Sequence, residues 1–222
     1  SAPKSVSSVW AAGNREQRDG ITRAHKAAVA KALEYYKRHG ASFRTGAGGA
    51  VVQRGEPVIA TFEHSTSRAG DCHLHDHALF FAVGVREDGK ISRVTVDMSH
   101  IHATGAVYRS TLAHELKAEG YEVERSDPKN GFFQIKGVPD GLMTAWSKRR
   151  AQVENVLRRE GKTDAKTSAK AAEISRSGKE NRDRGSNFAR WSAEAREYGF
   201  DPEAISSLRG RGRETVPIEP GK

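Results

Sequence analysis

The sequence predicts an α+β domain built on a mainly antiparallel sheet. Short apolar runs separated by glycine- and proline-containing turns fill residues 41–96, as is typical of strands joined by hairpins. Residues 14–40 and 104–120 instead repeat apolar side chains at helical spacing, and each segment ends in a glycine. Hairpin-joined strands interrupted by two helices favour a sheet with helices packed against it.

The first elements are a short run and a long helix. Ser5 to Trp10 has strand character. Asn14 then offers a helix N-cap, and Gln17 stands where a capping-box partner is needed. We expect the helix to end at Gly40 and to pack one face on the sheet. The residues of that face are Ile21, Ala24, Ala28, Ala32, Leu33 and Tyr36.

The strands follow. Glycine-rich turns at 46–49 and 55–57 separate apolar runs at 50–53 and 58–64. A histidine-bearing strand ends at Val85. The Asp-Gly pair in Glu87–Lys90 then predicts a hairpin, so that residues 91–96 return as another strand.

The second half turns increasingly helical and basic. We expect a helix over 104–119, in which Tyr108 packs, and a hairpin of 121–125 with 132–135. Residues 142–160 and 188–198 read as helices anchored by Trp146 and Trp191, and the segment between them is polar and basic. The predicted organisation is a main domain at 1–140, a basic helical region at 141–208 and a disordered tail at 209–222.

Composition limits the function classes. The 222 residues carry a formal net charge of +9, and residues 147–213 hold 17 Lys and Arg against 10 Asp and Glu. This basic balance favours a polyanionic partner such as nucleic acid. No run approaches the ~20 apolar residues of a membrane span. Cys72, the single cysteine, excludes an internal disulfide, and we expect a cytoplasmic protein.

His64, His75 and His77 are the strongest functional signal. His75 and His77 are two residues apart, so on a strand they share a face, and His64 ends the preceding strand. If the two strands fold back on each other, the imidazoles converge into a metal site with open coordination positions. A cluster of ordinary surface histidines is the alternative. Apolar residues continue in the same phase at Leu79, Phe81 and Val83.

Several motifs stand in a fixed order along the chain: Ser1–Ser7 (SAPKSVS), Phe62–Arg68 (FEHSTSR), Leu74–Ala78 (LHDHA), Gly105–Arg109 (GAVYR) with Leu112–Leu116 (LAHEL), and Ser147–Arg150 (SKRR). Together they resemble the relaxase domain of TrwC/TraI-type conjugative relaxases, the MobF family. The resemblance extends to about residue 208, and the paired histidine motifs and the opening motif are its specific parts.

The resemblance implies both a fold and a chemistry. The family nicks one DNA strand at a transfer origin through a tyrosine, which leaves a 5′-phosphotyrosyl adduct. Its fold is a palm-like antiparallel sheet with C-terminal helical fingers over the DNA. The resemblance assigns His64, His75 and His77 to a divalent metal (Mg, Mn or Zn) that polarises the scissile phosphate as a Lewis acid. The implied partners are single-stranded or hairpin DNA and other relaxosome proteins.

The sequence also departs from the family pattern. The family's nucleophilic tyrosines and a supporting aspartate precede the SAPKS motif, whereas this sequence begins at Ser1 of that motif. We therefore expect metal and DNA binding without a covalent adduct. Tyr35 and Tyr36 are predicted to pack late in the first helix. The other departures are Ala82, where asparagine is usual, and Cys72-His73, where proline and a polar residue are usual.

Six residues are predicted to contact DNA: Arg68, Ser67, Lys4, Lys148, Arg149 and Arg150. Arg68 follows a Thr-Ser pair beside the histidines, where a guanidinium can grip phosphate bidentately. A structural pairing of Arg68 with Asp71 is the alternative, and Lys4 is equally consistent with an ordinary lysine at a strand end. Lys148–Arg150 open a basic helix that could line a DNA groove.

Four neighbours of the histidines have alternative roles. Cys72 could close a zinc site as a fourth ligand, although its place in a turn favours no metal contact. His73 shares the strand parity of His75 and stays open as a ligand. Asp76 falls on the opposite face and is not expected to bind metal. Asp71 either orients an imidazole or caps a loop.

Two other functions are compatible with these features. A metal-dependent nuclease would use water in place of the tyrosine, but no general base is evident near the motif. A catalytically inactive DNA-binding module would hold structural zinc or no metal, and a site closed by Cys72 would indicate it.

Overall fold

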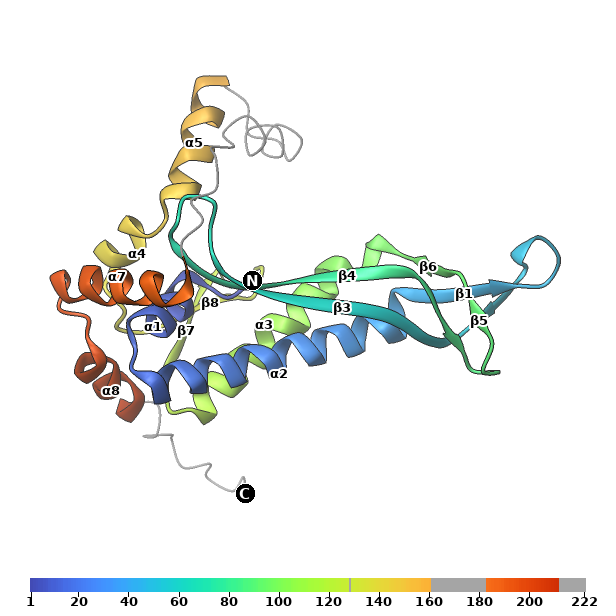
Figure 1. The fold of residues 1–222 in the computed structure, drawn as a ribbon, viewed down its shortest axis with the longest axis horizontal. Helices are drawn as coiled ribbons and strands as arrows, with labels where there is room; N and C mark the ends of the chain where they lie inside the picture. The colour runs from blue at the N-terminus through green and yellow to red at the C-terminus, as the bar shows by residue number, and fades with distance from the viewer. Residues whose placement is uncertain (128, 161–182, 212–222) are drawn as a thin grey trace, which may run out of the picture.

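A two-stranded ribbon lies along a long helix and forms the axis of the molecule (Figure 1). A computed structural model describes residues 1–127, 129–160 and 183–211. The ribbon is the hairpin of β3 (Gly55–Thr66) and β4 (Cys72–Arg86), and the helix is α2 (Arg15–His39). One end of the ribbon lies among helices, and the other end carries short strands (Figure 1).

Of the remaining elements, α3 runs beside α2, and the others gather mainly at these two ends (Figure 1). The further helices are α1 (Lys4–Ala12), α3 (Ile101–Ala118), α4 (Asp140–Ala145), α5 (Lys148–Glu160), α7 (Arg184–Glu197) and α8 (Pro202–Arg211). The further strands are β1 (Ala41–Thr45), β2 (Val51–Gln53), β5 (Ile91–Ser92), β6 (Val94–Val96), β7 (Val123–Asp127) and β8 (Phe132–Ile135). The 3-10 helices are η1 (Ala47–Gly49) and η2 (Met98–His100).

The predicted α+β class with antiparallel pairing is confirmed, because every strand pair in the described residues is antiparallel. The strands divide among three sheets, with orders β2-β1-β6, β3-β4-β5 and β7-β8. The β3–β4 ribbon pairs over nearly its whole length and has two register shifts, between Pro57 and Ile59 and between His64 and Thr66.

The long helix α2 begins and ends as the sequence predicts. Asn14 accepts a hydrogen bond from the Gln17 backbone N–H at 3.0 Å, and the Gln17 side chain accepts from the Asn14 N–H at 2.8 Å. This reciprocal capping box satisfies two amides that the first turn leaves without a helical partner. The buried face of α2 packs beside α3, whose Leu112 and Leu116 are fully buried.

The first element is a correction, because Ser5 to Trp10 form the helix α1 and not a strand. All residues from Ser5 to Ala12 are buried, since α1 contacts α2, α4, α7, β4 and β8. Val6, Val9 and Trp10 do stand at helical spacing, but in a run this short a helical pattern and a strand pattern are hard to tell apart. Two buried serines bond to strands: Ser7 Oγ accepts from Leu74 N–H at 3.2 Å and Ser5 Oγ from Ile135 N–H at 2.9 Å.

The C-terminal helices share the core of the N-terminal ones. Trp10 contacts Phe188 and Trp191 of α7, at ring-centroid distances of 4.8 and 6.4 Å. Trp191 and Trp146 are buried, which confirms that they anchor helices. The predicted regions 1–140 and 141–208 are therefore joined by one hydrophobic core. The helix predicted at 142–160 is divided into α4 and α5 at Trp146–Ser147, and α5 projects away from the core (Figure 1).

Two predicted segments lie partly outside the residues that the structure describes. The first residues of the tail predicted at 209–222 are helical, because α8 continues to Arg211 and Arg209 donates to the Glu119 carbonyl at 3.1 Å. Positions 212–222 lie outside the described residues, and so does most of the polar basic segment before α7 (161–182). In the described part of the chain, no helix is both long enough and apolar enough to cross a bilayer.

Candidate metal centre and nucleic-acid interface

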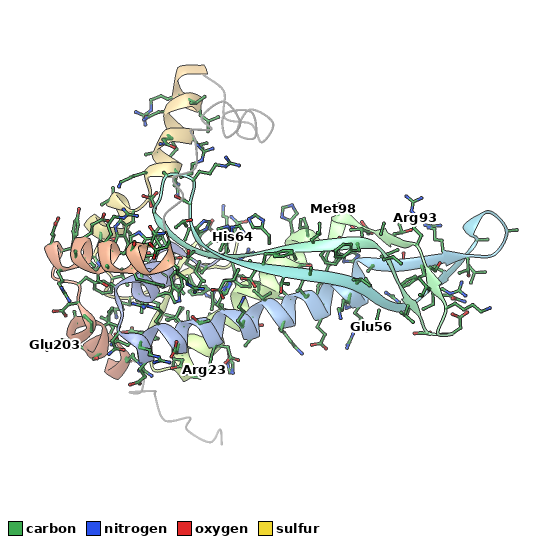
Figure 2. The ribbon with its side chains drawn as sticks, viewed as in Figure 1. Arg23, Glu56, His64, Arg93, Met98 and Glu203 are labelled. Carbon is green, nitrogen blue, oxygen red and sulfur yellow. The ribbon has the colours of Figure 1, made fainter. Side chains whose placement is uncertain are left out.

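The register of the β3–β4 ribbon brings the three predicted histidines together. His64 pairs directly with His75, and Phe62 pairs with His77, so His64 and His77 are diagonal neighbours on one face. The ring centroids are 5.3 Å apart for His64–His75, 4.7 Å for His64–His77 and 5.0 Å for His75–His77. We call this side of the ribbon, with Leu79, Phe81 and Val83, the histidine face (Figure 2).

The three imidazoles form a donor set that fits a metal ion. One ring nitrogen from each histidine can be chosen so that all three lie within 4.8 Å of one another. Two nitrogens that each bind zinc at about 2.1 Å can be at most about 4.2 Å apart, so small side-chain rotations suffice. His77 is exposed and the other two are half-buried, so the face stays accessible to a further ligand. The arrangement suits a site with open coordination positions.

A backbone contact orients His75. Its Nδ1 lies 2.8 Å from the carbonyl oxygen of His73. A carbonyl can only accept, so Nδ1 carries the proton and Nε2 keeps the lone pair that a metal needs. Metal-binding histidines commonly donate their second ring nitrogen to a carbonyl or carboxylate in this way.

The electrostatics of this face favour neutral imidazoles. Burial and the neighbouring His77 and His64 lower the pKa of His75, against the opposing effect of its bond to His73. Burial, with smaller contributions from His75 and Lys4, lowers the pKa of His73 to about 3. Neutral imidazole is the form that binds metal, so the lowered pKa of His75 favours its role as a ligand.

His73 and Cys72 are not members of the donor group. The His73 ring stacks on His75 at a centroid distance of 4.5 Å, and its carbonyl orients that histidine. Cys72 is fully buried in the main core, and burial raises the pKa of its thiol to about 12. A thiol in that state gives no support to a closed zinc site, but Cys72 lies in the core at the start of β4 and not in a turn as predicted.

The tip of the ribbon is built by Ser67 and Asp71. Ser67 Oγ accepts from the Ala69 and Asp71 backbone N–H groups at 3.2 and 3.3 Å. The buried Asp71 carboxylate accepts from Ser67 Oγ and from the Arg149 N–H at the start of α5, both at 3.3 Å. Of its two predicted roles, Asp71 therefore has the capping one, and it joins the ribbon tip to α5.

The predicted DNA contacts occupy the same end of the ribbon. Arg68 is exposed at the tip and, within the described residues, forms no ion pair with Asp71. Lys4 starts α1, and its Nζ donates to the Cys72 carbonyl at 2.8 Å. Lys148 and Arg150 are exposed at the start of α5, where Arg150 pairs with Glu154 at 2.7 Å. Arg149 is half-buried, with its amide on Asp71.

An open cleft adjoins this end of the molecule. Its volume is about 1130 Å³, and residues of β4, α3 and the β7–β8 hairpin line it. Lys4, Arg109 and Arg150 contribute positive charge to its walls, and Arg109 lies over the Phe132 ring at 4.7 Å. Sequence reasoning missed Arg109, which lies in a motif that is otherwise helical packing.

Sequence reasoning also missed what lies behind the histidines. Glu63 and Asp76 pair directly across the ribbon, on the side toward α2, which we call the helix face. Asp76 Oδ1 lies 3.2 Å from His25 Nε2, and His25 Nδ1 lies 2.8 Å from the Tyr108 hydroxyl. Burial lowers the pKa of His25, against the opposing effect of Asp76. The available signal was that each acid is adjacent in sequence to a predicted ligand, Glu63 to His64 and Asp76 to His75, and therefore lies on the opposite face of the ribbon.

The three tyrosines that the sequence analysis considered, Tyr35, Tyr36 and Tyr108, have structural positions. Tyr36 is buried and donates to the Asp97 carbonyl at 2.9 Å, and Tyr35 lies against His39. Tyr108 is buried in α3, and burial raises its pKa well above the usual range. The prediction that Tyr35, Tyr36 and Tyr108 serve packing is consistent with these contacts.

Comparison with known proteins connects this site to one family. A family model described as TrwC relaxase matches residues 1–198. The multifunctional conjugation protein TraI of Escherichia coli (strain K12) is 27% identical over 233 residues, which cover 100% of this chain and 13% of that protein. A second Escherichia coli TraI is 28% identical over the same share of each chain. This chain thus spans 13% of the length of these curated relatives.

Solved structures agree with the sequence match. The conjugative relaxase TrwC in complex with OriT DNA, in a metal-free structure, has a TM-score of 0.80 and 32% identity, over 90% of this chain and 72% of that chain. TrwC complexed with a 27-mer DNA comprising the recognition hairpin and the cleavage site gives the same values. A copper-bound complex of TrwC with OriT DNA has a TM-score of 0.79 and 32% identity, over 90% of this chain and 69% of that chain.

Proposed function

This chain belongs to the TrwC relaxase family, and on that premise we propose that it holds a divalent metal on His64, His75 and His77 and binds single-stranded or hairpin DNA at a transfer origin. The convergence of three imidazoles on the open face of the ribbon is the observation that supports the proposal most. In the full protein this domain would serve metal-dependent strand nicking and transfer.

The residues of the chain suit that role. A metal bound here would neutralise the non-bridging oxygens of a phosphodiester as a Lewis acid. His75 presents Nε2 because its other nitrogen is committed to the His73 carbonyl. His64 and His77 complete the set, and the exposure of His77 leaves room for the phosphate. The native ion is Mg, Mn or Zn, since imidazole donors accept several metals and phosphate oxygens can complete the shell.

DNA contacts are proposed around the ribbon tip. Arg68 grips a phosphate from the exposed turn, with Ser67 in the same turn. Lys4, Lys148, Arg149 and Arg150 supply positive charge beside the cleft, where a polyanion gains from counterion release. The TrwC structures that this chain resembles contain OriT DNA, including a recognition hairpin, and this supports the choice of DNA as ligand.

Neither alternative function gains support from the site. A nuclease that activates water needs a general base facing the metal, and Glu63 and Asp76 face the other way and pair with Lys26. A closed structural zinc site needs a fourth ligand, and Cys72 lies in the core. We further propose that the protein works in the cytoplasm with other relaxosome proteins.

Metal titration tests the proposal first. Zn²⁺ and Mn²⁺ are titrated calorimetrically into chelator-treated, dialysed protein and into His75→Ala. The parent should bind one ion per chain and His75→Ala should bind none. His73→Ala is the matched control, because its ring is outside the donor group and its backbone carbonyl remains. An absence of stoichiometric binding in the parent protein would overturn the metal proposal.

DNA binding is tested with a labelled stem-loop oligonucleotide that carries a single-stranded tail. Arg68→Ala should weaken binding about fivefold or more and reduce the slope of log K against log salt by about 1. Arg23→Ala is the charge-matched control, since Arg23 lies on α2 away from the ribbon and pairs with Glu119 (Figure 2). Equal losses in both variants would refute a specific contact at Arg68.

Covalent capture is the remaining test. Tyr35, Tyr36 and Tyr108 are engaged in packing or hydrogen bonds, so we expect this chain to bind the oligonucleotide without forming an adduct. A band of protein linked to DNA on a denaturing gel, in the presence of Mn²⁺ or Mg²⁺, would contradict this expectation.

A further inference from the structure

Two carboxylates face each other directly behind the metal site. Glu63 and Asp76 form the rung of the β3–β4 ribbon next to the His64–His75 rung. Successive residues of a strand alternate faces, so the acids point toward α2 while the histidines point away. The Asp76 side chain is 4% exposed and that of Glu63 is 17% exposed, so water screens little of their mutual repulsion.

Lys26 of α2 bridges this acidic pair. Its Nζ lies 3.1 Å from Glu63 Oε2 and 2.9 Å from Asp76 Oδ2. The other partners each reach one acid: Arg184 of α7 contacts Glu63 Oε1 at 2.7 Å, and His25 contacts Asp76 Oδ1 at 3.2 Å. Among the described residues, Lys26 is therefore the cation that bonds to both strands at this rung.

Opposed like charges on directly paired residues push two strands apart. A separation at the Glu63–Asp76 rung is transmitted to the next rung, because the strands are continuous through both. The three imidazoles can share one ion only if His64 and His75 keep their spacing, because the donor atoms of the three rings, which lie within 4.8 Å of one another, must still come slightly closer to bind it.

We propose that Lys26 is a positioning residue for the metal site. Its ammonium, clamped between Glu63 and Asp76, holds the two strands at the separation at which His64, His75 and His77 share one ion. The inference rests on the proposed metal function. It adds to that function a residue that lies on a different element and contacts none of the ligands.

The direction of the effect separates positioning from a simple electrostatic field. Lys26 carries positive charge close to a site for a cation, so through space alone its removal would tighten metal binding. Positioning predicts the opposite, a weaker site. In the Lys26→Met variant, further removal of the Glu63 carboxylate would weaken metal binding through space alone, whereas positioning predicts that binding recovers, so comparison of the single and double variants is a second test.

The experiment measures Co²⁺ and Zn²⁺ affinity by calorimetry and the Co²⁺ d–d absorption spectrum. Lys26→Met should weaken binding about 10- to 100-fold, the range typical of residues that orient metal ligands, and should alter the Co²⁺ spectrum. Lys26→Arg should rescue both. Lys26→Met/Glu63→Gln should also recover affinity to within about threefold of the parent, because one of the opposed charges is gone.

Lys31→Met is the matched control, because Lys31 lies on the same helix, is 61% exposed and pairs only locally with Glu34. It should bind metal as the parent does.

If circular dichroism shows that Lys26→Met does not fold, the double variant carries the test, and a loss of more than tenfold in the metal affinity of its folded form would overturn the proposal. Unchanged or tighter binding in folded Lys26→Met would overturn it as well. Absence of binding in the parent would instead overturn the proposed function.

Discussion

The two faces of the β3–β4 ribbon differ in how they are partnered. On the helix face, Asp76 is bonded to His25 and Lys26, and Phe80 packs against Tyr36 at a centroid distance of 4.9 Å. On the histidine face, Leu79 is 51% exposed and Phe81 is 43% exposed. Adjacent residues of one strand thus belong to a closed protein interior and to an open surface.

This difference indicates that the helix face contributes more to stability and that the histidine face is available to a ligand. Buried polar groups with protein partners cost free energy when a partner is removed. Exposed imidazoles and apolar side chains contribute little to folding and are available to a ligand. We therefore expect helix-face substitutions to change the free energy of unfolding, and histidine-face substitutions to change metal binding.

The largest expected effect on stability is that of His25→Leu. The substitution leaves the buried Tyr108 hydroxyl without its partner and removes a bond to Asp76. We expect the free energy of unfolding to fall by about 2–4 kcal/mol in urea titrations. His39→Leu, at an exposed position on the same helix, should cost less than about 0.5 kcal/mol. Equal effects of the two variants would abolish the distinction between the faces.

Metal should stabilise the protein through the histidine face alone. At a Zn²⁺ concentration of one hundred times Kd, binding to the native state should raise the free energy of unfolding by about 2.7 kcal/mol. The metal-free stability of His64→Ala should lie within about 0.5 kcal/mol of the parent, with no gain on adding Zn²⁺. A large loss of metal-free stability in His64→Ala would show that the histidine face also supports the fold.

Acid should destabilise the metal-free protein through His73, which lies between the buried residues Cys72 and Leu74 and is the exception to this division of the faces. Its folded pKa of about 3 lies below the unfolded value of about 6.5. The free energy of unfolding should be independent of His73 well above pH ~6.5 and should fall as the pH drops toward ~3. In that range the unfolded chain binds a proton at His73 and the folded chain does not. The metal-free parent should lose about 1 kcal/mol more per pH unit than His73→Asn between pH ~6.5 and ~5, before most carboxylates titrate. Parallel stability profiles for the two proteins would contradict this assignment.

The smallest expected effect is that of Leu79→Thr. Half of the Leu79 side chain is already exposed, and threonine suits a strand as well as leucine does. We expect the free energy of unfolding to change by no more than about 0.5 kcal/mol in the same urea titrations. A loss of more than about 2 kcal/mol would mean that this face is covered in solution.

The histidine site was predictable because strand geometry is simple. A two-residue spacing and one hairpin determine which side chains share a face, and the structure brings His64, His75 and His77 together as predicted. The capping box of α2 is equally local. Asn14 and Gln17 are three residues apart, and their bonds depend on nothing else in the chain.

Other features depend on tertiary packing and were not visible. The helix α1 was misread because its nine residues are too few for the helical spacing of Val6, Val9 and Trp10 to be distinguished from a strand pattern. The helix-face network joins Lys26, Glu63 and Asp76 from three elements, and no spacing rule relates α2 to the ribbon. The roles of Arg68, Ser67, Lys4, Lys148, Arg149 and Arg150 in DNA binding stay predictions, because a ligand must be present to define them.

The serine hydroxyls of α1 have a consequence for the motions of the protein. Ser7 holds the Leu74 amide in β4 and Ser5 holds the Ile135 amide in β8, two strands that belong to different sheets. Both amides can exchange with solvent only when α1 moves away from them. Amide hydrogen exchange should therefore report the same opening free energy at Leu74 and Ile135, as expected of one cooperative unit that runs from the metal ribbon to the β7–β8 hairpin.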